Sequence, residues 1–340
     1  MIDMTPVTKL PAKDVTQFFE PIKYELGVVE TWLQSNLIDD NPFVKELLSQ
    51  VFKSGGKRIR PGLVLLSSRA TSPNQGELSR LHIILAVLTE LIHTASLVHD
   101  DVIDKASLRR GQETVNTKWN DKVAVLIGDL LFAQASICLS RLMNPAIVGI
   151  YGQVLGDLCA GEIRQMRQQF NCQVDWNAYI QKSISKTATL FSAGTHSGAI
   201  LNASSDSIIG GLKTYGLNFG ICFQIVDDLL DITGNTTELG KKAGSDLAQG
   251  VITAPALFIL ERNDRPASRL KELITTRQVM QEEGTMEALA LIREHGGIEA
   301  TIKLCHNYAK TSQDSLYDLP SSIYKDSLME IVDYLLTRTS

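Results

Sequence analysis

The sequence predicts an all-helical fold, and three observations favour this class. Of its 340 residues, 44% are hydrophobic and 21% are charged, which suits a protein with a sizeable core. Apolar residues recur at helical spacing along most of the chain, whereas runs that alternate apolar and polar residues are few. Residues 77–101 and 207–233 form long segments that are apolar on most faces. Helices of that kind are usually buried, so we expect these two at the centre of the fold.

Segments rich in Gly, Pro, Asn and Ser separate the predicted helices, as in "TSPNQG", "NPAIVG", "GNTTELGKKAGSDLAQG" and "HGG". The segment "GLVLLSS" is short enough for a strand, but Pro61 before it favours the first turn of a helix. The apolar run "VAVLIGDLLFAQASICL" carries Asp129 near its middle and is short for a bilayer, so we expect a buried helix and no transmembrane segment. No linker divides the chain, and residues 1–340 are expected to form one domain, larger than a four-helix bundle.

Composition excludes several classes of protein. A net charge of -5 gives no reason to expect nucleic acid as a partner. The 5 cysteines are odd in number and never form C-x-x-C, which argues against a disulfide framework or a zinc site and suits a reducing compartment. The first twenty residues contain no arginine and no long apolar core, unlike a secretory signal or a transit peptide. We expect a soluble cytoplasmic protein, with a plastid location left open.

Two D-D-x-x-D motifs stand at the ends of the two long apolar segments. Their aspartates are Asp100, Asp101, Asp104, Asp227, Asp228 and Asp231. Residues four apart share a face of a helix, so the first and last aspartate of each motif should point together, with the middle one offset. Brought together, the two helix ends would form an acidic mouth above an apolar interior.

An acidic mouth of this kind needs cations. Mg²⁺ prefers carboxylate oxygens, keeps some of its waters and bridges to substrate phosphates. The alternative is two solvated acidic helix ends, since a single motif of this type also arises by chance. Nearby cations that can hold phosphate oxygens favour the metal interpretation. They are Lys57, Arg58 and Arg60 in "SGGKRIRP", and Arg109 and Arg110 in "RRG".

Three further residues are weaker candidates. Lys186 and Lys241 are each more often ordinary surface lysines. His93 lies seven residues before Asp100, two helical turns back on the same face, and is either a ligand contact or a satisfied core histidine. No G-x-S-x-G elbow, Walker loop or G-x-G-x-x-G after a strand is present. The pattern therefore suggests a substrate with a diphosphate head and an apolar tail.

These motifs resemble those of the trans-isoprenyl diphosphate synthases. The similarity runs from "GGKRIRPGL" through "ELIHTASLVHDDVID", "RRG", "GDLLFAQA", "GEIRQM" and "SKTATLF" to "FQIVDDLLDITG" and "LGKKAGSDL", over about residues 40–260. Long-chain, solanesyl-type synthases of cyanobacteria and plastids look nearest. The resemblance implies an isoprenoid-synthase-type helical bundle around a central cavity, usually a homodimer, that acts as a Mg²⁺-dependent prenyltransferase.

The resemblance also implies roles for individual residues. The implied Mg²⁺ ligands on the allylic diphosphate are Asp100, Asp104, Asp227 and Asp231, with Asp101 and Asp228 in support. The implied contacts to the same diphosphate are Arg109, Lys186 and Lys241. Those that would seat isopentenyl diphosphate are Lys57, Arg60, His93 and Arg110. Thr187 and Gln224 would present oxygen dipoles toward the developing cation.

The implied reaction is ionisation of the allylic primer, condensation with isopentenyl diphosphate and loss of a proton. Metal ions and cationic side chains stabilise the departing diphosphate, which makes the allylic carbocation accessible. The isopentenyl double bond attacks this cation, and the released diphosphate removes the proton. No nucleophilic side chain is required, in agreement with the lack of any recognisable triad.

Positions upstream of Asp100 predict the length of the product. Ser96 or Ala95, then Ile92 and Thr89, follow one another near one-turn intervals, and Thr89 lies about 16 Å from Asp100 on a straight helix. Short-chain relatives carry bulky aromatics at one or both of the positions matching Ala95 and Ser96. Small residues here predict a long-chain, solanesyl-like product, unless they serve only close helix packing. A farnesyl or geranylgeranyl diphosphate synthase is the alternative.

Two departures from the family pattern and two competing functions remain. Val251 stands where a lysine is frequent in relatives, which puts one diphosphate contact in doubt, and the C-terminal "YLLTRTS" lacks their basic ending. A terpene cyclase would share the fold and the first aspartate motif, but it usually lacks "GGKRIRP" and "RRG". A non-catalytic subunit of a heteromeric synthase would generally have damaged aspartate motifs, whereas both are intact here.

Overall fold

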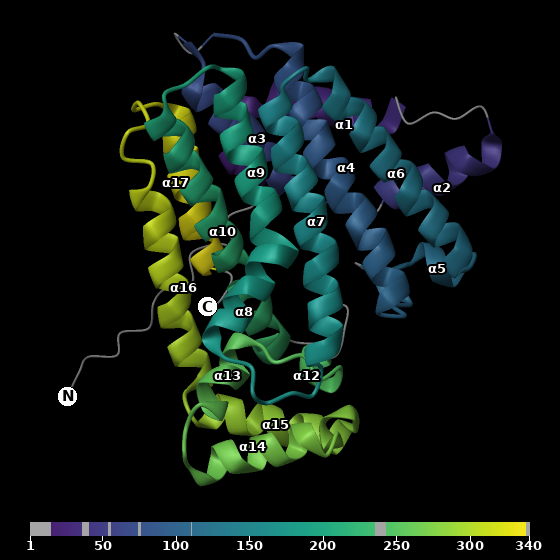
Figure 1. The fold of residues 1–340 in the computed structure, drawn as a ribbon, viewed down its shortest axis with the longest axis vertical. Coiled ribbons are helices and arrows are strands. Elements are labelled where there is room, and N and C mark those ends of the chain that lie inside the picture. The colour runs from purple at the N-terminus through teal and green to yellow at the C-terminus, as the bar shows by residue number, and fades with distance from the viewer. Residues whose placement is uncertain are drawn as a thin grey trace.

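The computed structural model describes residues 15–35, 41–53, 56–73, 76–109, 111–234 and 243–337. Helices dominate these residues, which confirms the predicted all-α class (Figure 1). The N-terminal elements are η1 (Val15–Ile22), α1 (Lys23–Ser35), α2 (Pro42–Lys53), α3 (Ile59–Thr71), α4 (Arg80–Ile103), β1 (Leu108–Arg109) and β2 (Gln112–Glu113). The middle ones are α5 (Val115–Lys118), α6 (Asp121–Arg141), α7 (Pro145–Gln168), α8 (Trp176–Ser183), η3 (Ile184–Ala188), α9 (Thr189–Leu201) and α10 (Asp206–Thr233). The last are α12 (Ser245–Ala248), α13 (Ala254–Leu260), α14 (Arg265–Thr275), η4 (Gln278–Met280), α15 (Glu282–Glu294), α16 (Gly297–Asp314) and α17 (Ile323–Thr337).

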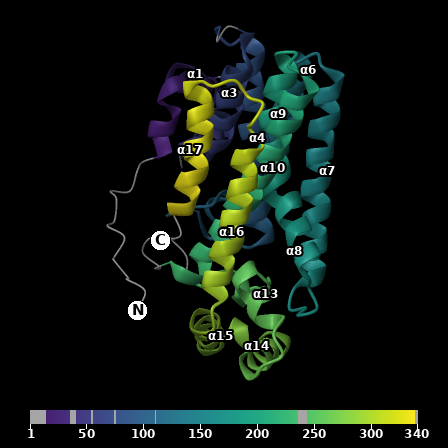
Figure 2. The same ribbon diagram turned by 90° about the vertical axis from the view of Figure 1, so that its left-hand side faces the viewer.

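The two long apolar segments form central helices, as their sequences predict. Helix α4 packs against α3, α6 and α9, while α10 packs against α9, α16 and the π-helical turn η3. Helices α16 and α17 cover one side of this core, and α13, α14 and α15 close its lower end in both views (Figures 1 and 2). The first aspartate motif ends α4, and the second lies in the last two turns of α10. Both apolar helices therefore deliver their aspartates near their C-terminal ends.

The prediction that the apolar run in α6 is buried is wrong. Only 33% of its most apolar window lies inside the protein, and for α7 the share is 22%. Together with α4, these are three helices that are long and apolar enough to cross a membrane, judged by length and composition alone. Helices α6 and α7 lie at one edge of the bundle (Figure 2), where Val125, Leu126, Ile137, Val148, Ile163 and Met166 are exposed. Periodicity alone could not show that this apolar face points outward.

Candidate active site

The lower ends of α4 and α10 flank a cavity of about 790 Å³. Acidic, basic and apolar residues from several elements share its wall. They are Gly56, Lys57, Arg58, Ile59, Arg60, Glu90, His93, Ser96, Leu97, Asp100, Asp104, Arg109, Lys186, Thr187, Phe223, Gln224, Asp227 and Asp246. Segments that are far apart in the sequence thus bring both aspartate motifs and several candidate cations to one space.

The first motif offers two carboxylates to this cavity. Asp100 is partly buried in the last turn of α4, and Asp104 is exposed at the C-cap, where its N–H donates to the Asp100 carbonyl oxygen. Burial raises the pKa of Asp100 to about 6, although the ammonium of Lys186 opposes the shift. A raised carboxyl pKa in a cleft marks a group that is stabilised once a cation enters.

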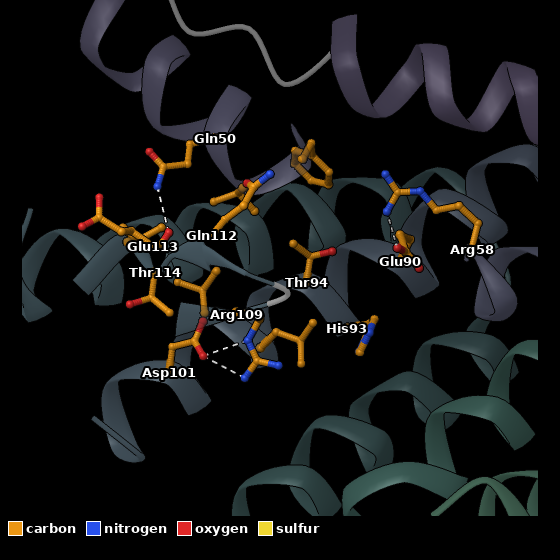
Figure 3. A pocket seen from close by; sticks show the side chains of 15 residues that line it. Gln50, Arg58, Glu90, His93, Thr94, Asp101, Arg109, Gln112, Glu113 and Thr114 are labelled. Atoms are coloured by element: carbon orange, nitrogen blue, oxygen red, sulfur yellow. Dashed lines mark hydrogen bonds and ion pairs between the residues drawn. The ribbon is translucent and has the colours of Figure 1, made fainter. Parts of the chain in front are cut away.

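Asp101 is buried, does not line this cavity and is fixed by Arg109. The guanidinium donates from Nε and Nη2 to the same carboxylate oxygen at 2.8 Å, as Figure 3 shows. Burial raises the pKa of Asp101, and Arg109 lowers it in part. The two-stranded hairpin β1–β2 presents Arg109, with Gly111 at φ 76 allowing the chain to reverse. This hairpin is too short for its alternation to be recognised in the sequence.

The second motif is arranged differently. Asp227 lines the cavity, but Asp228 is 1% exposed and Asp231 is 2% exposed. The Asp231 carboxylate accepts hydrogen bonds from Ser245 Oγ at 2.8 Å and from the Asp246 N–H at 3.2 Å. Asp231 therefore holds the start of α12. Helical spacing alone suggested that it would line the cavity beside Asp227, but it does not. The returning chain covers it and places the carboxylate of Asp246 in the cavity instead.

Lys186 and Thr187 lie in a π-helical turn, η3, which interrupts the helix formed by α8 and α9. Such turns are frequent at functional sites, because an extra residue re-aims the side chains. Lys186 Nζ lies 3.7 Å from Glu162 Oε2. Burial lowers the pKa of Lys186, but Glu162, Asp100 and Asp104 outweigh it, so the net pKa is raised and the ammonium charge persists.

Glycines set the spacing around this turn. A Cβ at Gly161 would lie 2.7 Å from Ser185 Cβ, and one at Gly220 would lie 2.4 Å from Ala188 Cα. Helices α7 and α10 therefore approach the turn almost backbone to backbone. The second approach brings Thr187 Oγ1 within 2.7 Å of Gln224 Oε1, to which it donates.

The turn before α3 supplies a second set of cations. Lys57 Nζ donates to Tyr334 Oη of α17 at 2.8 Å. Arg60 Nη1 lies 3.0 Å from His93 Nε2, and its guanidinium stacks 4.5 Å from the centre of the Phe191 ring. Both groups are pre-oriented at the cavity wall. Helix α17 thus contacts Lys57, a candidate substrate-binding residue, through Tyr334.

Arg58 has a structural role that the sequence did not reveal. Its backbone is left-handed, with φ 47, a conformation that side chains other than glycine adopt at a cost. Ion pairs hold it there: Nε with Glu30 Oε2 at 2.8 Å and Nη1 with Glu90 Oε1 at 2.7 Å. Figure 3 shows the contact between Arg58 and Glu90, and both residues line the cavity together with His93. Arg58 thereby connects α1 and α4 and shapes the turn that carries Lys57 and Arg60.

The cavity is suited to metal ions that arrive with a substrate. Within the described ranges, no group of three or more His, Cys, Asp or Glu side chains could hold a metal ion alone. Asp100, Asp104 and Asp227 nevertheless line one cavity together with cationic side chains. Mg²⁺ usually takes one or two carboxylates and completes its shell with water and phosphate oxygens, so this donor set fits it.

Some predicted residues lie elsewhere. Arg110 and Lys241 fall outside the described residues. Ser96 lines the cavity, whereas Ala95, Ile92 and Thr89 are buried below it, with 0%, 1% and 1% exposure. Thr89 Oγ1 lies 2.6 Å from Tyr151 Oη of α7, three helical turns below Asp100. The residues missed from the sequence are Glu162, Asp246 and Tyr334, whose only signal was their place in or near a motif.

Comparison with known proteins shows the family to which the chain belongs. A sequence profile described as Polyprenyl synthetase matches residues 41–292. The chain belongs to the polyprenyl synthetase family. It is 40% identical over 339 residues to the chloroplastic solanesyl diphosphate synthase 1 of Arabidopsis thaliana, covering 99% of this chain and 82% of that protein. A prenyl transferase of Synechocystis sp. is 41% identical, over 95% of this chain and 98% of its own.

Solved polyprenyl synthases have the same fold. A decaprenyl diphosphate synthase from Rhodobacter capsulatus superposes with a TM-score of 0.89 at 30% identity, over 96% of this chain and 99% of that one. A polyprenyl synthase from Caulobacter crescentus, complexed with calcium and isoprenyl diphosphate, gives 0.89 at 28% identity, over 97% and 100%. These matches confirm the predicted isoprenoid-synthase-type bundle and identify the protein as a prenyltransferase.

Proposed function

We propose that the protein is a long-chain all-trans polyprenyl diphosphate synthase with one catalytic domain over residues 1–340. The observation that carries this proposal is the shared wall of one cavity, where Asp100, Asp104 and Asp227 face Lys186 and a separate group of cations. The similarity to solanesyl diphosphate synthases supports the long-chain product. A cytoplasmic location stays a prediction.

The two groups of cations suit two diphosphates. Arg109 and Lys186 lie beside the first aspartate motif and would hold the allylic diphosphate, while Lys57, Arg60 and His93 would seat isopentenyl diphosphate. Mg²⁺, when bound by the outward aspartates, would supply charge that stabilises the leaving diphosphate. Calcium and isoprenyl diphosphate in the Caulobacter enzyme support a divalent metal of this kind.

The chain's own residues would direct the transfer. Lys186 keeps its positive charge because of Glu162 and the first motif, and it would neutralise charge on the departing diphosphate. Thr187 and Gln224 line the same cavity and would place oxygen lone pairs near the cationic carbon. The isopentenyl double bond then forms the new carbon–carbon bond, and the released diphosphate takes the proton.

The tail would extend along α4, past Ser96 toward Thr89 and Tyr151. Ala95→Tyr is expected to shift products toward farnesyl or geranylgeranyl length while the first condensations continue, because its ring fills space below the cavity. Chromatography of dephosphorylated products measures this shift, and Ser268→Tyr, at an exposed position of α14, is the matched control. An unchanged product ladder for Ala95→Tyr would place the tail elsewhere.

The exposed apolar face of α6 and α7 supports a homodimer. Val125, Leu126, Ile137, Ile163 and Met166 are each at least 41% exposed on these adjoining helices. A face of this extent marks a protein interaction surface, and a second copy of the chain would cover it. Sedimentation of the wild type and of Leu126→Glu tests this assignment, and a wild-type monomer would contradict it.

The activity test is incubation with Mg²⁺, labelled isopentenyl diphosphate and farnesyl diphosphate. Long-chain polyprenyl diphosphate is the expected product. Products that stop at farnesyl or geranylgeranyl length would contradict the long-chain assignment. A cyclic hydrocarbon would indicate a terpene cyclase, and a lack of product would favour a non-catalytic subunit.

A further inference from the structure

A buried hydrogen-bonded network lies behind the second aspartate motif. Asp228 is 1% exposed, and both of its carboxylate oxygens have partners. Oδ2 accepts from the Tyr179 hydroxyl at 2.7 Å and from the Ala254 N–H at 3.4 Å, while Oδ1 accepts from Gln224 Nε2 at 2.9 Å. Removing a carboxylate from water is costly unless it is hydrogen-bonded and neutralised. Burial raises the pKa of Asp228, and a nearby positive charge opposes this shift.

Lys182 of α8 supplies that charge. Its Nζ donates to the Ile252 carbonyl oxygen at 3.2 Å and lies 5.2 Å from the centre of the Tyr179 ring. Burial lowers the pKa of Lys182, and the nearby Asp228 and Asp246 carboxylates raise it in part. The ammonium group is thus directed into the protein, beneath the second motif, and not toward solvent.

Lys182 and Val251 line the same small hollow of about 20 Å³, together with Tyr179. Val251 is the position at which the sequence departs from its relatives by lacking a lysine. A positive charge therefore reaches the underside of the second motif from α8, although residue 251 does not provide one. A lysine at either position could therefore place its ammonium group in this hollow.

The network ends at the residues that face the substrate cavity. The amide N–H of Gln224 donates to Asp228, which turns the Gln224 amide oxygen toward Thr187. The Thr187 hydroxyl donates to this oxygen at 2.7 Å. Both side chains line the cavity. The position of Asp228 thus determines how the Gln224 amide and the Thr187 hydroxyl are oriented at the cavity wall.

We propose that Tyr179 and Lys182 are positioning residues for prenyl transfer, which rests on the proposed function. They hold the buried Asp228 side chain in place, and Asp228 fixes the orientation of Gln224 and Thr187. Neither residue contacts substrate in this arrangement. Lys182 also brings a positive charge next to Val251, the position at which relatives frequently carry a lysine.

Two substitutions that remove one buried hydroxyl each provide the first test. Tyr179→Phe removes the bond to Asp228, whereas Tyr215→Phe removes an equally buried bond of 2.8 Å to the Leu328 carbonyl oxygen, away from the cavity. Tyr179→Phe is expected to lower kcat by about 10–100-fold, with the KM for isopentenyl diphosphate unchanged. Tyr215→Phe should keep a kcat close to that of the wild type. Equal kcat values for the two folded variants would overturn the proposal.

The second test moves the charge. Lys182→Met leaves Asp228 without a counter-charge and should lower kcat by a similar factor, again at constant KM for isopentenyl diphosphate. Adding Val251→Lys to this variant is expected to restore most of the kcat, because the new ammonium enters the same hollow. A folded double variant, judged by its thermal midpoint, that stays as slow as Lys182→Met would refute the charge role. If the double variant does not fold, the tyrosine pair decides.

Failure of this inference differs from failure of the proposed function. An inactive wild type with farnesyl diphosphate, isopentenyl diphosphate and Mg²⁺ would contradict prenyl transfer itself. An active wild type whose Tyr179→Phe variant matches Tyr215→Phe would retain prenyl transfer and remove the positioning role.

Discussion

The two aspartate motifs have identical spacing but differ in what they offer the cavity. The first leaves Asp100 and Asp104 on the cavity wall, whereas the second leaves Asp227 there and buries Asp231. The difference arises from the segments that follow. After Asp104 the chain turns outward into a hairpin, but after α10 it returns through α12 and covers Asp231. Spacing therefore predicts which side chains share a face, and the later chain decides which remain accessible.

The largest expected effect concerns the aspartates that both motifs expose. Asp100→Ala and Asp227→Ala should each lower kcat by about 100-fold or more, because each removes negative charge that would hold metal against the leaving diphosphate. Steady-state assays at saturating Mg²⁺ measure the loss, and circular dichroism should show an unchanged fold. Asp326→Ala, at an exposed position of α17, is the matched control. A near-normal kcat in either cavity variant would contradict the proposed metal-binding role of that motif.

The last aspartates of the motifs should respond in opposite ways. Asp231→Ala removes the acceptor for Ser245 and the Asp246 N–H, and should destabilise the protein by about 1–3 kcal/mol. Asp104 is exposed, so Asp104→Ala should keep the wild-type thermal midpoint but need a higher Mg²⁺ concentration for activity. Thermal melts and Mg²⁺ titrations compare the two directly. Similar thermal midpoints for both variants would show that the motifs are equivalent after all.

Acidification should weaken metal binding at the first motif. The pKa of Asp100 is raised to about 6 by burial, so its proton competes with Mg²⁺ as the pH falls through that value. Acidification has the opposite effect on the folding stability of the metal-free protein, which it increases. Protonation favours the fold below the ordinary pKa of 3.8, and this contribution is lost as the pH rises through about 6. Mg²⁺ titrations of activity on either side of pH 6 test the competition between the proton and Mg²⁺. An unchanged Mg²⁺ concentration for half-maximal activity would contradict it.

The smallest expected effect separates the two arginines after the first motif. Arg109→Ala should raise the KM for the allylic primer and free Asp101, its partner at 2.8 Å. Arg110→Ala should raise the KM mainly for isopentenyl diphosphate. Initial rates with each substrate varied in turn distinguish the two. The reverse selectivity would mean that their roles are exchanged.

Much of the architecture could be predicted from the sequence. Long apolar helices, their C-terminal aspartates and the flanking cations follow from periodicity and local charge. The burial of Asp231 could not be predicted, because it depends on a return of the chain from Ser245. The contact of Lys57 with Tyr334 likewise joins residues 277 positions apart. The outward face of α6 was missed because an apolar face has the same sequence whether it points into the core or outward.

Backbone contact between α10 and η3 limits how this protein can vary over generations. Any side chain at Gly220 would place its Cβ 2.4 Å from Ala188 Cα and push the two elements apart. Gln224 lies one turn beyond Gly220, and Thr187 directly precedes Ala188, so that displacement would open the bond between them. Exposed positions of the same helix, such as Lys213, carry no comparable constraint. At residue 220 a single methyl group, and not a charge, sets the limit on neutral drift.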